Sequence, residues 1–510
     1  MNIDRTIKEL SGKDAEDLLL EQITAHHNGL IQALARFNAE EVFFTWLDTI
    51  RAIEELINLP LFGLDNESLE RAIIDLRLLP LDQAALKPIV DALVTLFGEN
   101  FTRRFVSTVL QAAEVGKRFN SKGHFEAAAG FQTIGHTIGY FQSRRRHLIT
   151  LLYILPKACN GKQSMDRLDT LNQLFPHVEH SCLTLTSLHE KVMLSKIFPD
   201  FKLLSDGNGF VANHTYEPLD STFLEPERAG IVEMLQDTVK KNVTEQMEPI
   251  NPRLIFSAAE LRNNIRQIES AYAEFDLANT AFGPMAEFTR QCLVYCEDDY
   301  LINVPHSTFE QLIKGVRLTT TMLSQLIHQS DDYVASTNSF APFINLSGSY
   351  VSTVTLLSRF LYYWKNICLN RNRRFQIRSG FIFESTVKSA LSDQGFTVTD
   401  IKRINRKEFD VVVVLGQIIY NVQCKNNLVD LSKIESNPDL FARYNRQLDR
   451  YYSKALIKEK GREELLKSKL GLSEVRHLVV SRFPIATTNS QVISYSRIDH
   501  FKAIINMVNW

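Results

Sequence analysis

The sequence has few cysteines, and their spacing is irregular. Six cysteines occur in 510 residues, at positions 159, 182, 292, 296, 368 and 424, without a CxxC pair. Glycine and proline are also modest, at 21 and 15 residues, and neither a fixed-period repeat nor a low-complexity tract occurs. These absences exclude a small disulfide-stabilised scaffold and a disordered chain. They favour an ordinary folded protein in a reducing compartment.

Long apolar runs are also absent. The nearest candidate, Leu148 to Leu155, is far shorter than the roughly 20 residues that span a bilayer as a helix. The first residues, Met1 to Arg5, lack the charged and then apolar profile of a secretory signal. The sequence therefore predicts a cytoplasmic protein without a membrane partner.

The net charge of −2 conceals an asymmetry between two parts of the chain. Residues 1–370 contain 33 basic and 45 acidic side chains, a net charge of −12, whereas residues 371–510 contain 24 and 14, a net charge of +10. A basic segment of this size is typical of proteins that bind a phosphate backbone. A lysine-rich, solvated helical surface is the alternative interpretation.

Hydrophobic spacing divides the chain into regions. Apolar residues three and four apart predict a large all-α N-terminal region, mostly α-helical over residues 1–345, with a break between two subdomains near 200–225. A recognition or regulatory role is expected for this region. A connector rich in Ser, Asn, Asp and Gly precedes an amphipathic linking helix and a basic entry segment over 350–374. A C-terminal domain is expected over 375–510, because the length exceeds what one hydrophobic core usually supports.

The C-terminal domain shows the order of an α/β core around a central mixed sheet. Its apolar runs and turn residues predict, in sequence order, a helix at 381–391, strands at 396–399, 410–414 and 418–425, helices within 441–470 and a strand at 475–481. Side chains alternate along a strand, so Gln423 and Lys425 should share one face of the third strand. Asp410 stands at the start of the strand before it.

These polar residues match the chemistry of metal-assisted phosphodiester hydrolysis. Such hydrolysis needs a divalent cation, a positioned water and a cation or proton donor beside the reacting oxygens. Asp410, the Gln423 amide oxygen and the Cys424 backbone carbonyl would supply oxygen ligands for Mg²⁺ or Mn²⁺, and Glu384 would approach from the preceding helix. Lys425 would reach the water or a phosphate oxygen.

At these residues the chain resembles the PD-(D/E)xK superfamily, which has the restriction-endonuclease-like fold. The resemblance is carried by Glu384, Asp410 and Gln423-Cys424-Lys425, covers about residues 375–500, and is nearest to the Mrr-like restriction endonucleases. It implies that Glu384, Asp410, Gln423 and Lys425 are catalytic and that DNA is the substrate, with RNA as the alternative. No winged-helix DNA reader, which often accompanies that family, is recognisable in residues 1–370.

A second pattern lies on the expected helix after the strands. Gln447 and Tyr451 are four residues apart and would lie on one helical face. The pair is similar to the Q-x-x-x-Y element of RecB-like nucleases, although an ordinary helix face is the structural alternative. The residues expected to contact nucleic acid are Arg378, Lys407, Asn426, Gln447 and Tyr451.

The sequence thus leads to a metal-dependent DNA endonuclease acting in restriction or anti-phage defence. A homodimer is one expectation, since double-strand cleavage by a one-site nuclease usually needs two copies. The N-terminal region would recognise an unidentified protein or trigger. Two alternatives remain: a nucleic-acid-binding protein on a nuclease-like fold with weak or no catalysis, and a helical protein-interaction module with an incidental basic domain.

Overall fold

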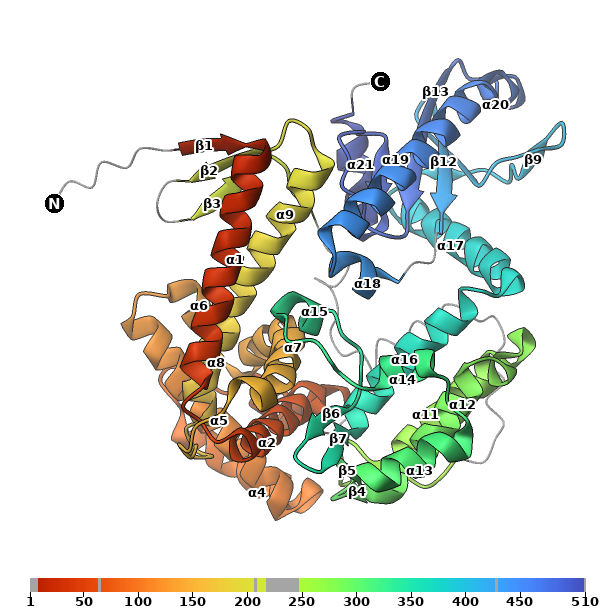
Figure 1. The fold of residues 1–510 in the computed structure, drawn as a ribbon. Coiled ribbons are helices and arrows are strands. Elements are labelled where there is room, and N and C mark those ends of the chain that lie inside the picture. Colours follow the sequence, from red (N-terminus) through yellow and green to blue (C-terminus); the bar gives the residue numbers. More distant parts are fainter. Residues whose placement is uncertain (1–7, 63–65, 206–208, 217–246, 427–429, 509–510) are drawn as a thin grey trace. The chain divides into compact units, whose positions relative to one another are not determined.

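The computed structural model describes residues 8–62, 66–205, 209–216, 247–426 and 430–508 (Figure 1). The chain forms two compact units. The first combines the described residues within Met1–Leu20, His189–Ser221 and Ile367–Trp510, and the second those within Glu21–Leu188 and Thr222–Asn366. This division differs from the expected succession of regions at 1–345, 350–374 and 375–510, because segments distant in sequence belong to the first unit. Among the described residues, no helix has the length and apolar character that crossing a membrane requires.

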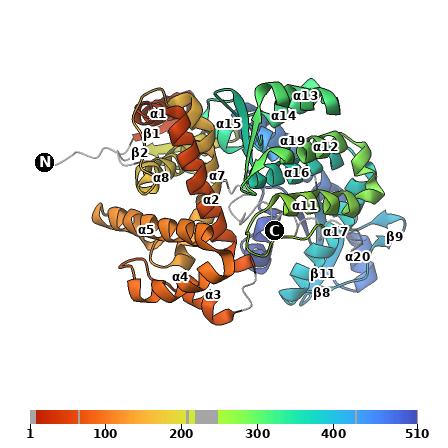
Figure 2. The same ribbon diagram turned by 90° about the horizontal axis from the view of Figure 1, so that it is seen from below.

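The second unit is mostly helical. Its described helices are α1 (Gly12–Leu34), α2 (Ala39–Asn58), α3 (Glu67–Ile74), α4 (Gln83–Phe97), α5 (Glu99–Ser121), α6 (Phe125–Ala129), α7 (Ile134–Ala158), α8 (Thr170–Ser181), α9 (Ser187–Ile197), α11 (Ala258–Ala271), α12 (Phe282–Cys292), α13 (His306–Val316), α14 (Thr320–Leu326), α15 (Tyr333–Thr337) and α16 (Val354–Leu369). Parts of α1, α9 and α16 belong to the first unit. Figure 2 shows α3, α4 and α5 following one another along one part of this unit.

The central helix α2 illustrates how the sequence forms these elements. The Asn38 side chain accepts a hydrogen bond from the Glu41 amide and caps the first turn. Apolar residues at helical spacing, including Phe43 and Trp46, are fully buried in one continuous core. The Trp46 indole donates to the Leu148 carbonyl of α7 at 3.0 Å, so the packed pair α2 and α7 also satisfies its buried polar atom.

The basic run at Arg144 to His147 is part of this core. Arg144 forms a two-pronged pair with Glu179, at 2.6 and 3.0 Å, and Arg145 donates to Glu54 at 3.0 Å. His147 lies in hydrogen-bonding contact with the Tyr333 hydroxyl, with 2.8 Å between the two atoms. The run therefore forms buried pairs within the helical unit, and removing one partner of such a pair would leave the other group without it.

Strands also occur in the second unit, so this part of the chain is mostly helical, as the sequence predicts, but not all-α. A four-stranded sheet has the order β4-β5-β7-β6 and consists of β4 (Cys296–Glu297), β5 (Leu301–Pro305), β6 (Ile344–Leu346) and β7 (Ser349–Thr353). The expected linking helix over 350–374 begins later than predicted, because residues 350–353 pair with β5 and β6 in strand β7. The expected connector before it contains α15 and β6.

The first unit has a three-stranded antiparallel sheet near the chain's start. It consists of β1 (Lys8–Ser11), β2 (Lys202–Ser205) and β3 (Phe210–Ala212), in that order. Strands β2 and β3 form a hairpin in which Leu203 faces Ala212, although the turn at 206–208 lies outside the described residues. The first strand joins this hairpin across almost 200 residues of sequence and thereby connects the N-terminal segment to the unit.

A five-stranded mixed sheet forms the centre of the C-terminal part, as the sequence predicts. Its order is β14-β13-β12-β11-β8, with β11 antiparallel to β12 and β8, and β12, β13 and β14 parallel. The strands are β8 (Thr397–Val398), β11 (Val411–Leu415), β12 (Ile418–Lys425), β13 (Glu474–Ser481) and β14 (Val492–Ser494), and a separate short hairpin joins β9 (Arg403–Ile404) to β10 (Lys407–Glu408). The turn between β11 and β12 uses Gly416 at φ +61°.

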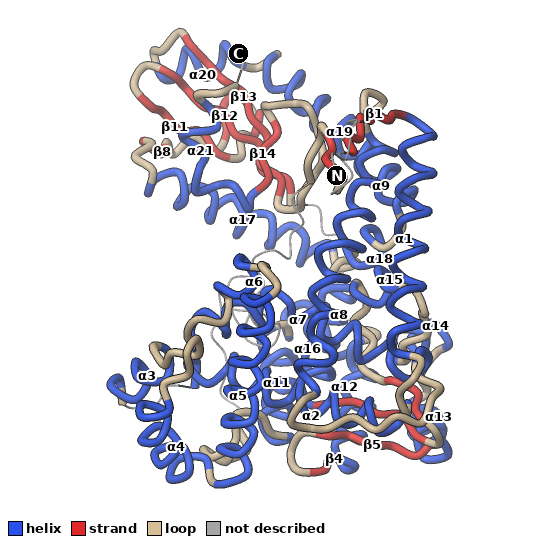
Figure 3. Tube along the Cα trace, turned by 90° about the vertical axis from the view of Figure 1, so that its left-hand side faces the viewer, coloured by secondary structure: helices blue, strands red, loops and turns tan. Residues whose placement is uncertain are grey.

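Helices cover both faces of this sheet (Figure 3). One face packs against α17 (Arg373–Asp393) and α21 (Phe501–Ile505), and the other against α19 (Pro438–Lys460) and α20 (Glu463–Leu470); the short α18 (Leu431–Glu435) precedes α19. The expected helix at 381–391 is longer than predicted, since α17 starts at Arg373 and includes the basic entry segment. Asn372 caps it by accepting the Phe375 amide.

Candidate active site

The β11–β12 hairpin places the predicted site residues beside one another. In the antiparallel register Val411 faces Val422, so Asp410 and Gln423 extend the same row by one step. The Asp410 carboxylate accepts a hydrogen bond of 2.9 Å from the Cys424 amide. The start of β11 therefore holds the Asp410 carboxylate in a fixed orientation next to the buried Gln423 amide.

Gln423 and Lys425 occupy the same face of β12, as alternation predicts. The Lys425 ammonium donates to the Gln423 Oε1 atom at 3.2 Å. Gln423 is 7% exposed, and its Nε2 atom has no hydrogen-bond partner among the described residues. Buried polar atoms are usually paired, so this amide is retained at some loss of stability.

Glu384 comes from the opposite face of the sheet, one residue after the core side chain Phe383 of α17. Burial raises the pKa of Glu384 to about 7, and the Asp410 charge acts in the same direction. Lys388 and Lys425 lower it. The effect of Asp410 on this pKa places the two carboxyl groups within electrostatic range of each other.

The pKa of Asp410 is also raised, again mainly by burial. Lys425 and the Cys424 amide act against this shift, while Glu459 and Glu408 reinforce it. Burial likewise holds the pKa of the Cys424 thiol well above its usual value, so that side chain remains a neutral part of the core between sheet and α17. The site thus concentrates acidic groups in a partly dehydrated setting.

Asn421 and Glu459 belong to the same face and were not predicted. Asn421 is fully buried and donates to Glu459 at 3.1 Å, with the His477 Nδ1 atom 3.2 Å from the same amide nitrogen. Alternation along β12 would have placed Asn421 with Gln423 and Lys425. Glu459 would have been recognisable as an acid on the buried stripe of α19 that contains Tyr452 and Leu456.

The predicted pair Gln447 and Tyr451 lies one turn apart on α19, and both side chains are exposed, Tyr451 by 51%. The Lys425 ammonium lies 5.7 Å from the centre of the Tyr451 ring, within reach of a cation–π interaction. The helix therefore presents this face next to the end of the hairpin that holds Lys425.

The other expected nucleic-acid contacts differ in their surroundings. Lys407 is exposed in β10, and Arg378 is partly buried on α17. Asn426 donates to the Ser379 hydroxyl at 2.7 Å and accepts from Arg482 at 3.2 Å, so it fastens the end of β12 to α17. Arg482 was not predicted, but it follows β13 directly and adds a cation near the end of β12.

Within the described part of the chain, no three His, Cys, Asp or Glu side chains are grouped so that they could hold a metal ion. The candidate ligands here are instead mixed: the carboxylates of Asp410 and Glu384, the Gln423 amide and the Cys424 backbone carbonyl. No protein-family model, curated protein or solved structure matches the chain in comparisons with known proteins.

Proposed function

We propose that the C-terminal domain is a metal-dependent endonuclease of the PD-(D/E)xK type that hydrolyses DNA, in a restriction or anti-phage role. The supporting observation is the convergence of Asp410, Gln423 and Lys425 on one hairpin end, with Glu384 in electrostatic contact. The net charge of +10 over residues 371–510 adds attraction for a phosphate backbone.

The donor set fits Mg²⁺ or Mn²⁺, because carboxylate, amide and carbonyl oxygens are the ligands such hard cations prefer. Asp410, Gln423 and Glu384 would hold the ion, which would stabilise negative charge on the reacting phosphate and activate water. The Nε2 atom of the buried Gln423 amide has no partner among the described residues, and as a hydrogen-bond donor it would suit a phosphate oxygen.

The protein groups would divide the remaining work. The Cys424 amide fixes one Asp410 oxygen, leaving the other for a ligand. Lys425 would neutralise a phosphate oxygen or orient the attacking water, and Tyr451 would keep its ammonium near the hairpin end. Gln447 and Tyr451 would face the nucleic acid from α19.

Plasmid cleavage in Mg²⁺ or Mn²⁺ tests the proposal. The wild-type chain should nick or cut DNA, Asp410→Ala should abolish cleavage, and Lys425→Ala should reduce its rate by about 100-fold or more. Lys469→Ala, which removes an exposed lysine of α20, is the matched control and should cut like wild type. Undiminished cleavage by the Asp410 and Lys425 variants would contradict the assignment.

One observation favours a second candidate, a DNA-binding protein without efficient catalysis. The Lys425 ammonium already donates a hydrogen bond to the Gln423 Oε1 atom, which is the atom that would have to ligate a metal cation. This candidate predicts salt-sensitive DNA binding that persists in Asp410→Ala, together with intact plasmid in every metal tested. Cleavage by the wild-type chain would exclude it.

A further inference from the structure

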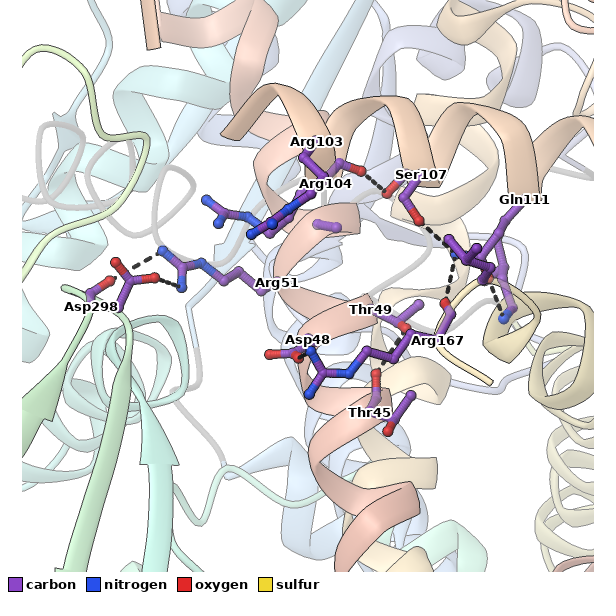
Figure 4. A pocket seen from close by; sticks show the side chains of 14 residues that line it. Thr45, Asp48, Thr49, Arg51, Arg103, Arg104, Ser107, Gln111, Arg167 and Asp298 are labelled. Atoms are coloured by element: carbon purple, nitrogen blue, oxygen red, sulfur yellow. Dashed lines mark hydrogen bonds and ion pairs between the residues drawn. The ribbon is translucent and has the colours of Figure 1, made fainter. Parts of the chain in front are cut away.

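A pocket of about 530 Å³ with several charged residues in its lining lies within the second unit (Figure 4). Helices α2 and α5, the turn before α8 and the turn between β4 and β5 form its walls. Its volume falls in the range of small-molecule sites, about 300–1,000 Å³. The charged residues that line it are Arg51, Arg103, Arg104, Arg167, Asp48 and Asp298. Four guanidinium groups against two carboxylates favour an anionic ligand.

Two of these arginines are fixed parts of the wall. Arg104 makes a two-pronged pair with Glu55, at 2.8 and 2.7 Å, and Arg51 donates to the same carboxylate at 3.1 Å. Arg51 also donates to the Asp298 side chain at 2.6 Å and to its backbone carbonyl at 3.1 Å. Asp298 has a left-handed backbone with φ +48°, an unfavourable conformation that this double contact helps to hold.

The other two arginines keep most of their donors for a ligand. Arg103 is exposed on α5 and makes one described side-chain hydrogen bond, to Asn100 at 3.2 Å. Arg167 is 76% exposed and comes no closer than 3.8 Å to Asp48. A guanidinium carries five N–H donors and suits phosphate or carboxylate oxygens. Two partly satisfied guanidinium groups from separate elements therefore open onto one pocket.

Groups that would bind ligand hydroxyls lie in the same pocket, an acceptor on Asp48 and a donor on Ser107. The Asp48 carboxylate accepts no hydrogen bond from the described residues, and removal from water raises its pKa even though Arg167 and Arg51 act against that shift. The Ser107 hydroxyl oxygen accepts from the Gln111 amide at 3.1 Å, which leaves its proton to be donated. Gln111 is itself held by the Leu171 amide at 2.9 Å.

We propose that this pocket binds a small phosphorylated molecule with free hydroxyl groups, either a nucleotide or a sugar phosphate. Arg103 and Arg167 would hold the phosphate through charge-assisted hydrogen bonds. Asp48 would accept hydrogen bonds from hydroxyl groups, as acidic residues do for ribose in nucleotide sites. The apolar side chains of Leu168 and Leu171 would contact the remainder. This inference is independent of the proposed nuclease activity.

Isothermal titration of the full chain tests it with five probes: AMP, ATP, glucose 6-phosphate, adenosine and inorganic phosphate. Organic phosphates should bind more tightly than inorganic phosphate, and adenosine should not bind. The comparison of AMP and ATP with glucose 6-phosphate distinguishes the two sources of the shared chemistry. The double variant Arg103→Gln/Arg167→Gln should weaken binding of every phosphate at least about tenfold, since it removes two charged donors.

Two further variants make the result specific. Asp48→Asn should weaken binding of the organic phosphates and leave inorganic phosphate unaffected or tighter. Arg71→Gln removes a guanidinium that is 79% exposed on α3, outside the pocket lining, and should bind every probe like wild type. Circular dichroism confirms that each variant is folded.

Four results would overturn the inference: no probe binding at millimolar concentration, unchanged binding by the Arg103/Arg167 double variant, inorganic phosphate as tight as the organic phosphates, or an equal loss in Arg71→Gln.

Discussion

Glu384 lowers the stability of the metal-free fold, and a neutral side chain should relieve that effect. Its pKa rises from 4.5 to about 7, first through burial and then through the charge of Asp410. A folded-state pKa above the unfolded value means that the folded protein binds the proton more tightly. Below pH 4.5 Glu384 therefore does not lower the stability of the fold, because it is protonated in both states. Its destabilising effect appears as the pH rises and is complete above pH 7.

The magnitude follows from the shift. At about 1.36 kcal/mol per unit the full shift corresponds to about 3 kcal/mol, and the partial exposure of Glu384 reduces this to about 1–2 kcal/mol. Glu384→Gln keeps the shape and removes the charge. It should raise the free energy of unfolding by about 1–2 kcal/mol at pH 8.5 and leave it nearly unchanged at pH 4.

Urea unfolding in EDTA measures the effect, with hydrogen exchange of the β12 amides as a local reporter. Glu464→Gln, on the exposed side of α20, is the control and should change stability by less than about 0.5 kcal/mol at either pH. A gain of equal size at both pH values, or a loss at pH 8.5, would refute the reasoning. Added Mg²⁺ should then stabilise wild type more than Glu384→Gln, by mass action; equal stabilisation would count against Glu384 as a ligand.

Three further predictions concern the cores. Burial lowers the pKa of His147 to about 3, so as the pH falls below 6.5 the unfolded state binds a proton that the folded state does not. The free energy of unfolding of the wild type should therefore fall by about 2 kcal/mol by pH 5, and that of His147→Gln should not, as urea unfolding measures. Arg145→Met leaves Glu54 as a buried charge without its guanidinium and should lower the unfolding free energy by about 3–5 kcal/mol in the same assay. Tyr452→Phe removes a buried 2.8 Å contact with Ser481 and should cost about 1 kcal/mol, seen as faster exchange of β13 amides.

Local signals predicted the centre of the C-terminal domain well. The β12 strand lies at Ile418–Lys425 as expected, because alternation, β-branched residues and the Gly416 turn act over a few residues. The start of α17 was placed too late, at residue 381, directly after Gly380. A glycine inside a helix costs only about 1 kcal/mol, and burial of Phe375 and Phe383 on either side offsets it.

Non-local pairing explains what the sequence did not show in the second unit. The strand β7 was read as the start of a helix, but it pairs with β5, whose residues lie almost 50 positions earlier. Short strands of three to five residues, such as β6, carry little periodic signal of their own and depend on their partners. The β-branched residues Val351 and Thr353 were the available indication that residues 350–353 would be extended.

In the candidate site, the sequence likewise predicts which residues lie together but not which atoms are in contact. Spacing predicts that Gln423 and Lys425 share a face, but it does not predict which atom the ammonium contacts. Likewise, the sequence gives no measure of how close Glu459 on α19 comes to Asp410, which depends on packing of the helix against the sheet. Contacts between distant segments therefore had to come from the structure.

These contacts bear on the choice between an enzyme and a nucleic-acid-binding protein without catalysis. Asp410 raises the pKa of Glu384, while Glu459 and Glu408 raise that of Asp410, so neighbouring acids disfavour the charged forms of both groups. Lys425 offsets this repulsion with a single positive charge, and its ammonium group also donates a hydrogen bond to the Gln423 oxygen. A divalent cation would relieve more of the repulsion than one ammonium can, and it would free Lys425 to meet a phosphate. Stabilisation by Mg²⁺ that Asp410→Asn abolishes would therefore support the enzyme, whereas DNA binding that needs no metal would support the nucleic-acid-binding protein.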